Sequence, residues 1–170
     1  MANGGAKSAA SILLIVNLVL YSVVIVIASW AVNHGIQRSR ETASVLSIPA
    51  RIFPIYFTFG NTATGFFVIF SLIAGVVGFG TSLTGLHNVV QWDGPSLHTA
   101  AAASLATCSL SLLAMGLACK EIDLGWTDSN LRRLETITIL VTATQLFSTC
   151  VIHVGVEDVI AQERSRTGRV

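Results

Sequence analysis

Long apolar runs without a charged side chain dominate the chain. Four such runs cover residues 8–37, 52–92, 94–119 and 136–156. A helix needs about 20 predominantly apolar residues to cross the hydrocarbon core of a bilayer, and each run meets that length. The pattern therefore predicts an all-α integral membrane protein, a four-helix transmembrane bundle that forms one domain over residues 1–170.

The expected spans are shorter than the runs, because polar residues and prolines occupy the ends of the runs. A single helix over 52–92 would be about 60 Å long, roughly twice the thickness of the core. Two prolines and several aromatic residues near 48–59 indicate an interfacial or re-entrant segment instead. The sequence thus predicts spans near 8–31, 62–85, 96–118 and 136–156 and a polar tail over 159–170.

The connections say little about orientation. An even number of spans puts both termini on one side of the membrane. The first and third loops hold six Lys and Arg residues, and the termini and second loop hold four, so the positive-inside rule does not fix which side this is. Asp93 or Ser96 could cap the start of the third helix.

Composition excludes several classes of protein. Only 11% of the 170 residues are charged, against about 25% in soluble domains. A net charge of +1 gives a nucleic-acid partner no electrostatic support. The four histidines show no metal-ligand spacing, the three cysteines lie in or beside apolar runs, and no catalytic motif is present. We therefore expect no enzyme, no metal and no cofactor.

Small residues recur at alternating steps of three and four in the second and third spans, so each set lies on one helical face. We expect these faces to bring the two helices into close contact, with Val68 off the contact. A crevice lined by hydroxyl groups is the alternative interpretation. The two faces consist of Ser71, Gly75, Gly78, Ser82 and Gly85, and of Ala100, Ser104, Thr107, Ser111, Ala114 and Ala118.

Two amide side chains fall near the middle of their spans, Asn17 in the first and Gln145 in the fourth. An unpaired amide facing lipid is costly, so both should point into the bundle. They serve either as hydrogen-bonding links between helices or as polar contacts for a solute. No Asp, Glu, Lys or Arg lies within an expected span, which argues against an ion pump or a buried proton relay.

Several blocks of sequence resemble the AWPM-like family, which is named for an abscisic-acid-induced plasma-membrane polypeptide of wheat. The resemblance implies a four-span plant plasma-membrane protein that is induced by abscisic acid, dehydration or cold. It also implies a role in the uptake of abscisic acid. The blocks are Asn17-Leu-Val-Leu-Tyr21, Asn33-His-Gly-Ile36, Ile48-Pro-Ala-Arg-Ile-Phe-Pro-Ile-Tyr-Phe57, the stretch 63–78, Thr81-Ser-Leu-Thr-Gly85, Leu113-Ala-Met-Gly-Leu-Ala-Cys-Lys-Glu121 and Gly155-Val-Glu-Asp158.

A site for abscisic acid needs apolar walls, a few polar groups and one cation, because the molecule is mostly apolar with a carboxylate, a ketone and a hydroxyl. Arg51 is the candidate cation, and its alternative role is to reach lipid phosphates. The candidate polar contacts are His87, Asn88, Gln145 and His153. The resemblance itself fixes none of these residues.

The rival function is a non-transporting membrane organiser or stabiliser during dehydration. The small-residue faces suit such assembly equally well, and they also allow a homo-oligomer. The expected partners are therefore the lipid bilayer and abscisic acid or a similar small carboxylate, without nucleic acid.

Overall fold

The described part of the chain is a bundle of four long helices. The computed structural model describes residues 2–45, 62–124 and 129–167. Its helices are α1 (Ala2–Val45), α2 (Thr62–Gln91), α3 (Gly94–Leu124) and α4 (Ser129–Thr167). Each contains a segment long and apolar enough to cross a bilayer, which confirms the predicted four-helix membrane bundle.

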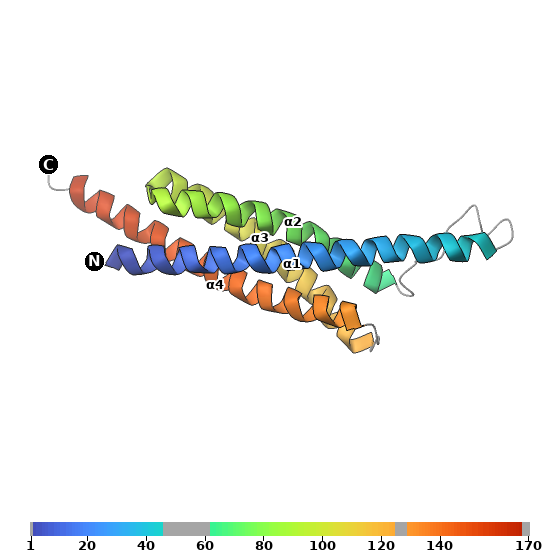
Figure 1. Cartoon of the computed structure of the whole chain (residues 1–170). Coiled ribbons are helices and arrows are strands. Elements are labelled where there is room, and N and C mark those ends of the chain that lie inside the picture. The colour runs from blue at the N-terminus through green and yellow to red at the C-terminus, as the bar shows by residue number, and fades with distance from the viewer. Residues whose placement is uncertain (1, 46–61, 125–128, 168–170) are drawn as a thin grey trace.

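Successive helices run in opposite directions, so the two termini lie at the same end of the bundle (Figure 1). Both α1 and α3 pack against α2 and α4. This arrangement places the helices at the corners of a square, with an interior to which all four contribute. The C-terminal part of α1 projects beyond the other helices.

The helices extend beyond the expected spans. The α1 helix continues beyond the expected first span into polar sequence and ends at Val45. The α4 helix continues through most of the polar tail and ends at Thr167. Charged residues follow the apolar segments on these extensions, as expected where a helix leaves the bilayer. The segment near 48–59, with Arg51, lies outside the described residues.

The distribution of polarity is reversed relative to a soluble bundle. Large apolar side chains such as Val26, Val76 and Phe147 point outward, with exposed fractions of 68%, 55% and 63%. Small and polar residues such as Asn17 and Thr107 are fully buried. Lipid solvates the outer apolar surface, and the polar groups find partners only inside the bundle.

A two-residue turn joins α2 to α3. Trp92 adopts a left-handed conformation with φ of 52°, and its N–H donates to the carbonyl of Asn88 at 3.2 Å, which caps the end of α2. Asp93 occupies the cap position of α3, because its carbonyl accepts the first helical hydrogen bond from the Leu97 N–H at 3.0 Å. The Ser96 hydroxyl instead donates to the Gln91 side chain at 2.9 Å.

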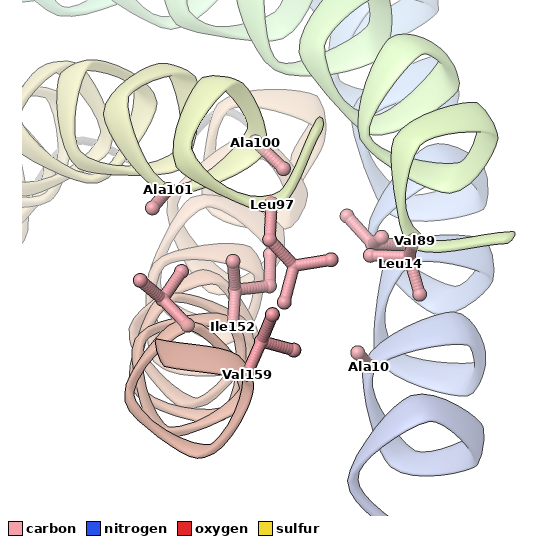
Figure 2. Close-up of a cluster of buried hydrophobic side chains, with 9 residues drawn as sticks. Ala10, Leu14, Val89, Leu97, Ala100, Ala101, Ile152 and Val159 are labelled. Carbon is pink, nitrogen blue, oxygen red and sulfur yellow. The ribbon is translucent and has the colours of Figure 1, made fainter. Parts of the chain in front are cut away.

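An apolar cluster fixes this end of the bundle (Figure 2). All four helices contribute to it, with Leu14 from α1, Val89 from α2, Leu97 from α3 and Ile152 from α4. The indole of Trp92 packs against the same cluster, and a Cβ at Gly155 would lie 3.0 Å from it. These apolar contacts act against the cost of the left-handed backbone, which is about 1–2 kcal/mol for a residue with a Cβ, while the indole N–H is buried without a hydrogen-bond partner.

The small face of α2 is buried as expected, but its glycines have a different neighbour. The expectation that they contact the third span is wrong, because Gly75 faces Ile25, Gly78 faces Tyr21 and Gly85 faces Leu14, all on α1. Periodicity identifies the face of a helix that is buried but does not specify which of two adjacent helices covers it.

Val68 also departs from expectation, since it is fully buried in the core cluster that contains Phe67 and Leu134. The buried arc of α2 is wider than one row of small residues, because α2 packs on two neighbours at once. Substitution of Val68 is therefore no neutral control for the glycine face.

Two glycines of α2 make a matched test of this packing. A Cβ at Gly78 would overlap the ring of Tyr21, whereas a Cβ at Gly80 meets nothing within 4 Å. Because a rigid ring cannot yield, we expect Gly78→Ala to lower the free energy of unfolding by about 1–3 kcal/mol. Gly80→Ala should leave it unchanged or raise it slightly. The measurement is reversible unfolding in mixed micelles, and equal stabilities of the two variants would contradict the α1–α2 contact.

Candidate functional site

A network of polar side chains crosses the middle of the bundle. Asn17 Nδ2 donates to Gln145 Oε1 at 3.0 Å. The Tyr21 hydroxyl is hydrogen-bonded to Ser111 Oγ at 2.8 Å and to Gln145 Oε1 at 3.4 Å. Asn17 and Gln145 are 0% and 2% exposed, which agrees with the expectation that both point inward. Their direct contact links α1 to α4 at mid-bundle.

The small face of α3 contributes backbone acceptors to this network. The carbonyl of Ser104 accepts from Gln145 Nε2 and from Thr149 Oγ1, each at 3.3 Å. The carbonyl of Ser111 accepts from Thr142 Oγ1 at 3.1 Å. Small side chains at these positions let α4 approach closely enough for its side chains to reach the α3 backbone.

Beside the network lies a small cavity that residues from all four helices line. Its volume of about 10 Å³ is near the smallest that holds one water molecule. Two of its hydroxyl groups, Ser71 Oγ and Thr138 Oγ1, are buried without a hydrogen-bond partner. The lining consists of Tyr21, Val24, Ser71, Ala74, Gly75, Ser111, Ala114, Thr138, Val141 and Thr142.

The candidate ligand contacts occupy separate parts of the bundle. Gln145 lies in the central network, whereas His153 lies about 12 Å further along α4, where its Nδ1 contacts the Thr149 carbonyl at 2.8 Å. His87 is exposed near the end of α2 and pairs with Gln91 at 3.3 Å, and the Asn88 carbonyl caps that helix.

None of these four residues lines the central cavity. The candidate cation Arg51 lies outside the described residues. The described structure therefore supports Gln145 as an interior polar group and leaves ligand binding by the whole set as a prediction.

Two buried carboxyl groups were missed from the sequence. Glu121 of α3 is 0% exposed and Glu135 of α4 is 6% exposed. The sequence interpretation placed both outside the spans, in or beside the third loop. Helical periodicity carries the missed signal, because Glu121 lies three residues after Ala118 and Glu135 three residues before Thr138. The buried faces of α3 and α4 therefore continue one turn beyond the expected spans.

The carboxyl cluster sits at the end of the bundle opposite the Trp92 turn. Thr64 Oγ1 of α2 donates to Glu121 Oε1 at 2.7 Å, while Glu121 Oε2 is buried without a partner. The nearby Lys120 and Asp123 pair with each other at 2.9 Å on the exposed side of α3.

Comparison with known proteins agrees with this architecture. The family model described as AWPM-19-like matches residues 15–155. The chain belongs to the AWPM-19-like family. The match covers the central network, the cavity and the carboxyl cluster.

A curated relative in rice (Oryza sativa subsp. japonica), named membrane protein PM19L, is 38% identical over 144 residues. The aligned region covers 84% of this chain and 76% of the rice protein. No solved structure matches the chain. Together with the four apolar helices, membership of the AWPM-19-like family makes this a multi-pass membrane protein in contact with the lipid bilayer.

The contact between Asn17 and Gln145 can be measured directly by a double-mutant cycle with Asn17→Ala and Gln145→Ala. Interhelical hydrogen bonds in membrane proteins contribute about 0.6 kcal/mol on average and up to about 1.7 kcal/mol. We expect a coupling energy within this range from unfolding in mixed micelles. A cycle between Asn17 and the exposed Leu146 is the control, and additive effects in both cycles would show that the amides do not interact.

Proposed function

We propose that this protein carries abscisic acid, or a similar small carboxylate, across the plant plasma membrane. The observation that carries the proposal is the polar seam in the middle of the bundle, which consists of the Asn17–Gln145 network and the cavity beside it. Asn17, Ser71, Ser111 and Gln145 bring amide and hydroxyl groups from all four helices to its interior. Membership of the family, with the uptake role that the resemblance implies, adds the identity of the substrate.

The chemistry of the seam suits such a substrate. Hydroxyl and amide groups can exchange hydrogen bonds with a ketone and a hydroxyl, and Ser71 and Thr138 have unsatisfied groups available for this. Apolar residues such as Val24 and Val141 line the same cavity and suit a hydrocarbon ring. Arg51 is the proposed partner of the carboxylate, since a guanidinium binds a carboxylate through two parallel hydrogen bonds.

Transport requires the bundle to open. The cavity of about 10 Å³ is far smaller than the roughly 300–1,000 Å³ of ligand pockets. In this account the described structure is a closed state, and the substrate enters when the helices separate around Ser71 and Thr138.

The closed interior also favours a second candidate, a membrane organiser that stabilises the bilayer during dehydration without transport. Close packing of α1 on the glycines of α2 and a large exposed apolar surface suit lateral assembly, including a homo-oligomer. Uptake of labelled abscisic acid by purified protein in liposomes separates the two functions. Uptake above that of empty liposomes supports transport, and its absence favours the organiser.

Arginine variants test the carboxylate partner within that assay. We expect Arg51→Gln to reduce the uptake rate several-fold, because an unpaired carboxylate is costly to desolvate, and to leave membrane insertion intact. Arg133→Gln is the matched control, since Arg133 is exposed on α4. If the Arg51→Gln variant takes up abscisic acid at the wild-type rate, Arg51 is not part of the binding site, and contact with lipid phosphates is its remaining role.

A further inference from the structure

We propose that the central cavity is the binding site of a single water molecule, which links Ser71 of α2 to Thr138 of α4. Both residues line the cavity, and the hydroxyl oxygen of each is buried without a hydrogen-bond partner. The water acts as a structural bridge inside the bundle, so the site goes beyond the proposed transport of a solute.

The cavity has room for one water molecule. Its volume of about 10 Å³ is at the lower end of the roughly 10–15 Å³ that a single water requires. Pockets for drug-sized ligands measure roughly 300–1,000 Å³, so a larger solute does not fit while the helices are packed as described. None of the described residues that line the cavity carries a charge, which argues against a bound ion.

Two hydroxyl groups at the cavity need a partner. Ser71 and Thr138 are 0% and 2% exposed, so bulk water does not reach them. Other hydroxyls of the bundle bond to a carbonyl of their own helix, as Thr142 Oγ1 does to the Thr138 carbonyl at 2.7 Å, but Ser71 Oγ and Thr138 Oγ1 do not. A buried hydroxyl in that state loses its hydration without compensation. Buried water molecules occupy such positions in proteins, because they supply the missing hydrogen bonds.

Ser111 supplies the third partner that a buried water commonly has. The Tyr21 hydroxyl donates to Gln145 Oε1 at 3.4 Å, so the hydrogen in its 2.8 Å bond to Ser111 comes from the Ser111 hydroxyl. Ser111 Oγ then keeps a lone pair, and Ser111 also lines the cavity. The water donates to this oxygen, and its remaining hydrogen and lone pairs serve Ser71 and Thr138.

The water bridge crosses the bundle along its second diagonal. The Tyr21–Ser111 hydrogen bond already joins α1 to α3, and the carbonyl of Ser111 joins α3 to α4 through Thr142. Ser71 and Thr138 lie on the diagonally opposite helices α2 and α4, and their hydroxyls do not bond to each other. A water between them therefore brings α2 into the central network.

Solid-state NMR on labelled protein in liposomes tests the site, because it detects transfer of magnetisation from water protons to nearby side chains. We expect transfer to the side chains of both Ser71 and Thr138 at short mixing times. Ser148 is the matched control, since its hydroxyl is also buried and unpaired but the residue does not line the cavity. Transfer to Ser148 should be several-fold weaker.

Thr138→Val tests the bridge itself, since valine keeps the shape of threonine and removes the hydroxyl. We expect transfer to Ser71 to fall several-fold, because the water loses one of its three partners. Thr144→Val is the control variant. The Thr144 hydroxyl bonds to the Leu140 and Val141 carbonyls of its own helix, so its removal should leave the transfer to Ser71 unchanged.

Absence of transfer to Ser71 or to Thr138 in the wild-type protein overturns the proposal, since that hydroxyl would then be dry. Transfer to Ser148 as strong as that to Ser71 also overturns it, because the signal would not depend on the cavity. Undiminished transfer to Ser71 in Thr138→Val would show that no water bridges the two residues. If Thr138→Val does not fold, Ser71→Ala makes the same test with Thr138 as the side chain observed.

Discussion

Tyr21 is the residue through which all four helices meet. Its ring lies over Gly78 of α2, where a Cβ would overlap it. Its hydroxyl reaches Ser111 of α3 at 2.8 Å and Gln145 of α4 at 3.4 Å. The absence of a side chain at position 78 therefore lets one phenol connect its own helix to three others. The amide contact of Asn17 and the cavity lining both depend on this placement.

The bilayer explains why such a polar interior is compatible with a stable protein. Between membrane helices the hydrophobic effect contributes little, so close packing and hydrogen bonds must hold the bundle. Under the proposed transport function, the same hydroxyls and amides that link the helices would also contact a solute when the helices separate. Ser71 and Thr138 differ from these groups, because their hydroxyls are buried without a hydrogen-bond partner.

The fold was predictable because charge-free length is a strong signal, and the inward direction of Asn17 and Gln145 followed from the cost of a lipid-facing amide. Which helices contact one another was not predictable in the same way. The glycines of α2 cover α1 rather than α3, since a helix in a square bundle has two neighbours and periodicity does not choose between them. The sequence does not predict the burial of Glu121 and Glu135, because a charge usually marks the end of a span, whereas here the helices and their interior faces continue past it.

The free energy of unfolding of Tyr21→Phe tests this account most directly, because the substitution keeps the ring over Gly78 and removes only the hydroxyl. The hydroxyl links three helices and its loss leaves buried partners unsatisfied, so we expect a destabilisation of about 1–3 kcal/mol in mixed micelles, with helical content unchanged. Wild-type stability of Tyr21→Phe would contradict the account, since it would show that the hydroxyl at the meeting point of the helices contributes no net stability.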